Sequence, residues 1–143
     1  MKVLLYRDMG WLLSDEAFSL YAPCMYYPIY EDFKAQMESF FVDFSVKIFV
    51  CDNQGEKTGV LVLKISGVSA EIIGIAVSEK SRCRGIGKFM IQFAMESEGL
   101  ERIEAQTDDD SIEFYRKCGF VEERIVITYP DGEAVRYNCV LNK

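Results

Sequence analysis

A short basic segment carries the side chains that are best suited to bind an anion. It consists of Arg82, Cys83, Arg84, Gly85, Ile86, Gly87 and Lys88. A helical pattern follows directly, and the first amides of a helix lack acceptors within the helix and attract negative charge. Because glycine lets an anion approach the backbone closely, the segment predicts a cradle for a pyrophosphate group.

Three phosphate-binding patterns can be compared with this basic segment. A Walker A loop requires Gly in place of Arg82 and Ser or Thr in place of Phe89, and a dinucleotide fingerprint requires Gly in place of Met90. The pattern that fits is R-x-x-G-x-G, with Arg82, Gly85 and Gly87. Taken alone, the segment is also compatible with an ordinary strand–turn–helix connection that has a basic first turn.

The residues that are absent or scattered limit the chemistry further. The chain has no histidine, which excludes Ser-His-Asp and Cys-His nucleophilic sites and histidine metal sites. Its five cysteines show no C-x-x-C spacing, so we expect neither a disulfide framework nor a metal site, and a reducing, cytoplasmic compartment is the simplest interpretation. Carboxylates, tyrosines or water must therefore carry any acid–base chemistry.

Length and charge describe a single acidic domain. With 143 residues, half of them apolar, we expect one domain over residues 1–143 with a well-formed core. The net charge of -7 argues against a nucleic-acid partner. No apolar run reaches the length of a membrane span, and the N-terminus does not resemble a signal peptide.

The hydrophobic pattern predicts the elements that position the basic segment. We expect strands over 3–6, 46–51, 58–65, 70–77, 102–106, 121–129 and 133–141. We expect helices over 14–21, 29–41, 86–97 and 110–117, the last with a capping box formed by Asp110 and Glu113. A helix between the strands at 70–77 and 102–106 provides the crossover that parallel pairing requires. The pattern therefore predicts an α/β domain with a mixed sheet.

A second motif follows the basic segment. Residues 111–120 are similar to A-x-x-F-Y-x-K-x-G-F, with Tyr115 as the tyrosine. With both motifs in this order, the chain resembles the GNAT superfamily of acyl-CoA-dependent N-acyltransferases. The resemblance implies the GNAT fold, in which helices flank a mixed sheet of about six or seven strands. It also implies acetyl-CoA as the acyl donor and an amine as the acceptor. Two positions depart from the family pattern, Asp108 in place of Asn and Ser111 in place of Ala.

The resemblance also assigns roles to residues. The basic segment would hold the pyrophosphate of CoA, and the oxyanion of the intermediate would bind a backbone N–H in the strand at Ile75, Ala76 and Val77, which the family opens with a bulge. Tyr115 would contact the cofactor and donate a proton to the leaving sulfur, and Glu71 or a chain of waters would accept the proton of the amine. A covalent route through Cys83 is disfavoured, since no histidine can activate it.

The acceptor stays open at this stage. The turn formed by Asp108, Asp109 and Asp110 is either a solvated helix cap or an acidic lip that attracts a cationic small molecule. A protein N-terminus or lysine is the rival acceptor. The aromatic residues between Phe18 and Phe33 either pack in the core or line the acceptor pocket. A non-catalytic acyl-CoA sensor and a module that binds no cofactor are the alternatives to an enzyme, and the sequence does not select or exclude a homodimer.

Overall fold

The computed structural model describes every residue from Met1 to Lys143 and is built around one seven-stranded sheet of order β1-β2-β3-β4-β5-β7-β6. The strands are β1 (Lys2–Leu5), β2 (Val46–Asn53), β3 (Glu56–Ser66), β4 (Ser69–Val77), β5 (Arg102–Thr107), β6 (Val121–Tyr129) and β7 (Gly132–Asn142). The helices are α1 (Met9–Leu12), α2 (Asp15–Tyr21), α3 (Tyr30–Val42), α4 (Ile86–Ser97) and α5 (Ile112–Lys117), with 3-10 turns η1 (Ala22–Cys24) and η2 (Glu79–Ser81). The prediction of a mixed α/β fold is confirmed.

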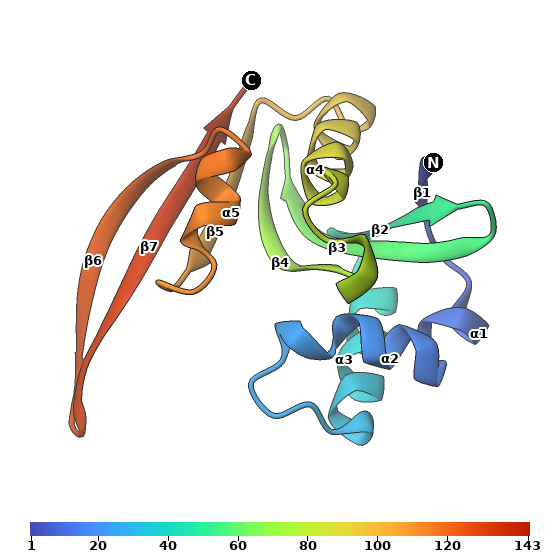
Figure 1. The fold of residues 1–143 in the computed structure, drawn as a ribbon, viewed down its shortest axis with the longest axis horizontal. Helices are drawn as coiled ribbons and strands as arrows, with labels where there is room; N and C mark the ends of the chain where they lie inside the picture. Colours follow the sequence, from blue (N-terminus) through green and yellow to red (C-terminus); the bar gives the residue numbers. More distant parts are fainter.

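One pair of neighbouring strands in the sheet is parallel, and the other pairs are antiparallel. Strands β1 to β4 pair in antiparallel fashion, β4 and β5 pair in parallel, and β5, β7 and β6 are again antiparallel. Helix α4 makes the predicted crossover between β4 and β5. The hairpin of β6 and β7 extends away from the rest of the molecule (Figure 1).

Helices on opposite faces of the sheet give the molecule two apolar cores. Phe49, Leu61 and Ile103 pack with Met90 and Ile91 of α4 and with Tyr115 of α5 in the larger core. The smaller core joins Val50, Val60 and Val62 to residues of α1, α2 and α3, including Tyr21, Phe33 and Met37. The aromatic residues of α2 and α3 that are fully buried here, Tyr21 and Phe33, are therefore core residues.

Most predicted elements agree with the structure to within a few residues, and one helix is additional. The pattern predicted no element between the strand at 3–6 and the helix at 14–21, but Asp8 caps α1 there, because its carboxylate accepts hydrogen bonds from the amides of Gly10 and Trp11. Ser14 caps α2 as expected, by accepting from the amide of Ala17 at 3.2 Å. None of the helices combines the length and the apolar character needed to cross a bilayer.

Candidate active site

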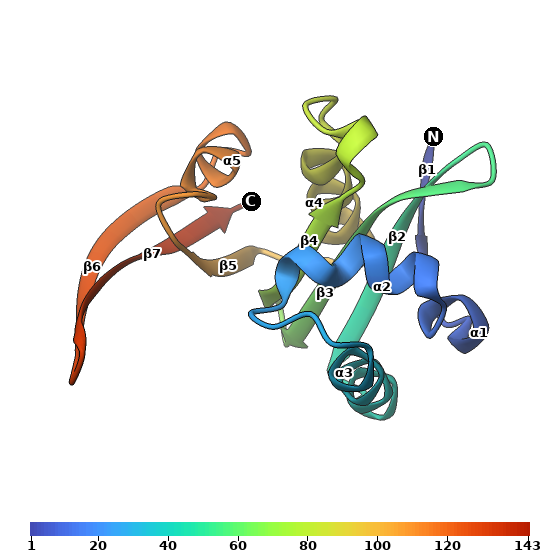
Figure 2. The same ribbon diagram turned by 60° about the horizontal axis from the view of Figure 1, so that its bottom comes forward.

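Strands β4 and β5 separate partway along their length. They pair only from Ser69 to Glu71 on β4 and from Arg102 to Glu104 on β5. Beyond that point β4 continues to Val77 without a partner on this side, and the two strands diverge (Figure 2). We call residues 73–77 on this side of β4 the open edge. An unpaired edge presents backbone N–H and C=O groups that can pair with a ligand.

A β-bulge lies at the start of the open edge. Val62 of β3 pairs with Gly74, but the next residue, Leu63, pairs with Ile72, so Ile73 is the extra residue. A bulge bends its strand and disturbs the local ladder. The resemblance placed a bulge near Ile75 to Val77, and the structure has it slightly earlier, at the point where β4 leaves β5.

The register of β3 and β4 shows which backbone groups face the open edge. The amide of Ser78 donates to the carbonyl of Thr58 at 2.8 Å, and residues of an antiparallel pair alternate in direction. The backbone N–H and C=O groups of Ala76 therefore point toward β3, whereas those of Ile75 and Val77 point outward. Of the three residues predicted from the sequence, Ile75 and Val77 present their backbone groups at the open edge and Ala76 does not.

Both outward carbonyls already have donors from side chains. The thiol of Cys24, in η1, donates to the carbonyl of Ile75 at 3.2 Å. Nε of Arg82 donates to the carbonyl of Val77 at 3.1 Å. The outward amides of Ile75 and Val77 have no neighbouring strand to pair with, so the open edge offers mainly hydrogen-bond donors to a ligand.

The basic segment continues this row of donors. Cys83 and Gly85 have positive φ angles of 63° and 76°, which turn the chain sharply into α4. The amides from Cys83 to Lys88 donate to no acceptor within the protein, and no side chain caps α4. The side chains of Arg84 and Lys88 are exposed beside them. The segment thus combines free amides, a helix N-terminus and positive charge.

The two glycines of the basic segment have different surroundings. Gly85 is exposed, and a β-carbon there would meet no atom within 4 Å. Gly87 is buried, and the ring of Phe114 fills the space beside its α-carbon. The missing side chain thus leaves open space at Gly85, whereas at Gly87 it makes room for Phe114.

Tyr115 lies on α5 with its ring in the larger core. The ring packs edge-on against Phe120, with centroids 5.2 Å apart, and the residue is 6% exposed. Burial, and then the nearby thiols of Cys139, Cys24 and Cys118, raise the pKa of Tyr115 well above its ordinary value. Its hydroxyl has no partner within the protein and is not one of the fully buried unpaired atoms, which are Trp11 Nε1 and Ser78 Oγ. The hydroxyl is therefore a protonated donor that solvent can reach.

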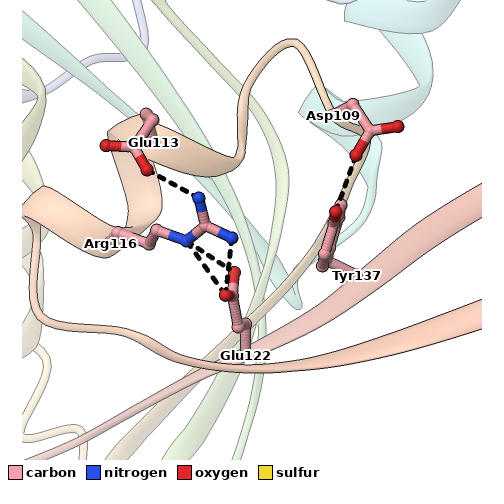
Figure 3. A network of polar contacts seen from close by, with 5 residues as sticks. All are labelled: Asp109, Glu113, Arg116, Glu122 and Tyr137. Carbon is pink, nitrogen blue, oxygen red and sulfur yellow. Dashed lines mark hydrogen bonds and ion pairs between the residues drawn. The ribbon is translucent and has the colours of Figure 1, made fainter.

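Polar contacts hold α5 against the hairpin (Figure 3). Arg116 bonds to Glu113 of its own helix at 2.6 Å and to Glu122 of β6 at 2.7 Å. The hydroxyl of Tyr137 on β7 donates to Asp109 at 2.6 Å. These contacts flank Tyr115 on both sides along the chain and fix its position relative to the hairpin.

Asp108 fixes the turn that precedes α5. Its carboxylate accepts hydrogen bonds from the amides of Asp110 and Ser111, both at 3.1 Å, and lies 3.8 Å from Arg136. Both amides lie before the first helical residue, Ile112, and Ser111 occupies the N-cap position without a side-chain hydrogen bond. The predicted capping box of Asp110 and Glu113 is therefore wrong, and Asp108 stabilises the turn before α5 rather than the helix end itself.

Glu71 lies apart from these groups. Its side chain is exposed, and it lies on the part of β4 that is still paired with β5. Four residues separate it from Ile75, which corresponds to roughly 13 Å along a strand. Glu71 therefore makes no direct contact with the outward amides of Ile75 and Val77.

Sequence reasoning missed the contribution of the helical N-terminal region to the open edge. Cys24 was considered only for its spacing from other cysteines, and Tyr21 only as one of several aromatic residues. Neither belongs to a motif, and each acquires its position through contacts across more than 50 residues of chain. Two hollows lie away from the basic segment, one in the smaller core beside Tyr21 and Trp11 and one beside β1 and α3.

Comparison with known proteins is consistent with this geometry. The model of the acetyltransferase (GNAT) family matches residues 7–120. No curated protein is similar enough in sequence to count as a match. Among solved structures, an aminoglycoside 6'-N-acetyltransferase complexed with coenzyme A has a TM-score of 0.80 at 15% identity, over 99% of this chain and 97% of that chain.

Two further solved structures have the same fold. A ribosomal-protein alanine N-acetyltransferase from Escherichia coli has a TM-score of 0.74 at 14% identity, over 99% of this chain and 92% of that chain. A variant of the spermidine N-acetyltransferase from Vibrio cholerae has a TM-score of 0.69 at 16% identity, over 99% of this chain and 95% of that chain. At these identities the likeness concerns the fold.

Proposed function

The chain belongs to the acetyltransferase (GNAT) family and is an acetyl-CoA-dependent N-acyltransferase, and we propose that it acetylates a primary amine by direct attack on the thioester. The amine nitrogen forms the C–N bond, the C–S bond breaks, and the electron pair leaves with the sulfur of CoA. The thiol nearest to the open edge, Cys24, supports direct attack, because burial raises its pKa to about 11 and a protonated thiol is a poor nucleophile.

The observation that carries this proposal is the continuous row of free donors from the open edge to α4. The amides from Cys83 to Lys88 would hold the pyrophosphate, with Arg84 and Lys88 adding charge. The outward amide of Ile75 would donate to the thioester oxygen and, more strongly, to the oxyanion that forms from it. The amide of Val77 lies between these two points and would bind the linker between the thioester and the phosphates.

Tyr115 is the group that we propose to assist the leaving sulfur. Its raised pKa keeps the hydroxyl protonated at neutral pH, so the hydroxyl can donate a hydrogen bond to the thiolate as the C–S bond breaks. The same raised pKa makes complete proton transfer to a thiolate unfavourable, since a thiol has a pKa of about 8.5. The thiolate therefore receives stabilisation from Tyr115 and its final proton from solvent.

The proton of the attacking amine needs a separate route. We propose that it leaves through water, and Glu71 is the carboxylate on β4 where that route would end. Glu71 lies on the face opposite to Ala70 and Ile72, which belong to the larger core, so its side chain is on the α2 side of the sheet. Glu71→Gln tests this role, since it removes the proton acceptor and preserves the shape of the side chain.

A cationic small molecule is the acceptor that we propose. The chain carries a net charge of -7, and the solved structures of the same fold include enzymes named for aminoglycoside and spermidine acetylation. A peptide with an N-terminal alanine is the rival acceptor, by analogy with the ribosomal-protein enzyme. The five free cysteines fit a reducing compartment such as the cytoplasm.

Release of CoA thiol from acetyl-CoA in the presence of an amine panel tests the proposal. The panel consists of spermidine, an aminoglycoside, and a peptide with an N-terminal alanine. We expect turnover with at least one cationic amine and a higher melting temperature with acetyl-CoA. A ligand present at 100 times its Kd adds about 2.7 kcal/mol to the free energy of unfolding. Stabilisation by acetyl-CoA without turnover of any amine would indicate a sensor, and the absence of both would exclude the proposed cofactor site.

A further inference from the structure

The peptide group that presents the Ile75 amide has little support from the sheet. It joins Gly74 to Ile75 and follows directly after the bulge at Ile73. On its outer side there is no β5, because the parallel pairing has ended at Glu71. Glycine beside a bulge gives the backbone more freedom than any other residue would. An amide that must point at one reacting oxygen therefore needs additional contacts to fix its direction.

Tyr21 provides one of these contacts. Helix α2 crosses the face of β4 (Figure 2). The ring of Tyr21 packs directly on Gly74, where a β-carbon would lie 2.7 Å from the Tyr21 hydroxyl oxygen and 2.8 Å from Cε2. Tyr21 is 2% exposed, so its ring is held within the smaller core. The Tyr21 ring therefore restrains the Gly74–Ile75 peptide from the face of the sheet that α2 covers.

Cys24 provides the second contact, three residues further along the chain. Its thiol donates to the carbonyl of Ile75, the residue whose amide faces the open edge. The carbonyl and the amide both belong to Ile75, so a hydrogen bond to the carbonyl restrains the backbone angles that also direct the N–H. Burial raises the pKa of the thiol to about 11, so the thiol keeps the proton that it donates.

We propose that Cys24 is a positioning residue for the acyl transfer, which holds the Ile75 amide in the direction that the oxyanion requires. The inference rests on the proposed function, because it assigns to Cys24 an effect on the reaction that the Ile75 amide serves. It gives the turn after α2 a role in catalysis through the Ile75 backbone, because the hydrogen bond of the Cys24 thiol is made to that carbonyl. Tyr21 and Cys24 act from the same side of β4, opposite to α4 and Tyr115.

Two substitutions of Cys24 separate this role from a merely structural one. Cys24→Ser keeps a donor at the same place, whereas Cys24→Ala removes it. Cys51→Ala is the matched control, because it removes a thiol that is fully buried in the larger core and donates no hydrogen bond. For each variant, kcat, the KM for acetyl-CoA and the melting temperature with and without acetyl-CoA are measured with an amine that the wild type acetylates.

We expect kcat of Cys24→Ala to fall about fivefold to tenfold, while the KM for acetyl-CoA and the shift in melting temperature stay near the wild-type values. Cys24→Ser should keep kcat within about twofold of wild type, and Cys51→Ala should lower the melting temperature and leave kcat unchanged.

Three outcomes would overturn the inference in different ways. If Cys24→Ala turns over as fast as wild type, Cys24 has no positioning role, although the transferase stands. If Cys24→Ala and Cys51→Ala lose kcat equally, the effect is one of stability alone. If the wild type binds acetyl-CoA and acetylates no amine of the panel, the proposed function itself has failed, and the positioning role fails with it.

Discussion

A β-carbon on Gly87 would lie 2.5 Å from Cε1 of Phe114, so helices α4 and α5 meet through a residue that has no side chain. Gly87 is the second glycine of the R-x-x-G-x-G pattern, and Phe114 belongs to the second motif. The contact therefore explains why the two motifs occur together. The first helical turn of α4, with its free amides, is packed directly against the helix that carries Tyr115.

Gly87→Ala should destabilise the protein by about 1–3 kcal/mol, the usual cost of overpacking a well-filled contact. A separation under 3.0 Å cannot persist, so either the Phe114 ring or the start of α4 must shift. Chemical denaturation measures the loss. Phe114→Leu in the same chain should recover part of it, because the smaller side chain makes room. A strictly additive loss in the double variant would show that the two residues do not interact.

Arg84→Ala should weaken acetyl-CoA binding about threefold at low salt, which is the scale of an exposed charge contact. The loss should shrink at high salt, since the exposed side chain of Arg84 is screened. Titration calorimetry with acetyl-CoA at two salt concentrations measures both effects. Lys80→Ala is the control, because Lys80 lies on η2 and pairs with Glu56. An equal loss of affinity for acetyl-CoA in both variants would indicate a long-range electrostatic attraction and no local contact between Arg84 and phosphate.

Tyr115→Phe should lower kcat by about 10²-fold, the lower end of the range for losing one hydrogen-bond donor to a charge that develops in the transition state. The KM for acetyl-CoA and the stabilisation by acetyl-CoA should change little, because the ring remains in the larger core. Steady-state kinetics combined with thermal unfolding measures the two properties separately. A kcat close to that of wild type would remove Tyr115 from the mechanism, whatever its position.

Alkaline pH should destabilise the protein through its buried acids. Burial raises the pKa of Tyr21 and Tyr115 well above their ordinary value, and that of Cys24 from 9.0 to about 11. Below the ordinary pKa both the folded and the unfolded chain hold the proton. Above it only the folded chain does, so the free energy of unfolding falls as pH rises from about 9.

Denaturant unfolding in reducing buffer from about pH 8 to 11 measures this fall around the ordinary pKa values of cysteine and tyrosine. Tyr115→Phe and Tyr21→Phe should each reduce the slope with which the free energy of unfolding falls with pH. Phe33→Leu, which removes buried volume and no titratable group, should lower the free energy of unfolding equally at all pH values. An unchanged slope in both tyrosine variants would show that these hydroxyls do not cause the loss of stability.

Local patterns predicted the strands, the helices and the two motifs well. Alternation and apolar runs identify β4 and α4 because burial imposes a period on the sequence. Gly99 and Gly119 end α4 and α5 with φ angles of 63° and 91°, as expected for the left-handed residue after a helix. The sequence therefore contains enough information for the fold, for the position of the basic segment and for the placement of Tyr115 on α5.

The details of the candidate site depend on tertiary contacts that leave no local trace. The bulge at Ile73 arises from the pairing of β4 with β3, and the open edge from where β5 stops pairing. The bond from Cys24 to Ile75 joins residues far apart in the chain. The capping box of Asp110 and Glu113 does not form, because Asp110 lies within a turn closed by Asp108 and the N-cap position falls on Ser111.

Asp108→Asn should raise the KM for a cationic acceptor several-fold and leave the KM for acetyl-CoA unchanged. Asp108 is among the groups that raise the pKa of Tyr115, so its charge acts on the proposed proton donor. Asn keeps an oxygen that can accept from the amides of Asp110 and Ser111, so the turn before α5 survives while the charge is lost. Asp131→Asn makes the same change in net charge at the turn between β6 and β7, far from α5 (Figure 1), and should leave both KM values unchanged. Steady-state kinetics with spermidine and with an uncharged amine measures the difference. If Asp108→Asn raises neither KM, the acidic turn serves only to hold the chain before α5, and the preference for a cationic acceptor must come from elsewhere on the surface.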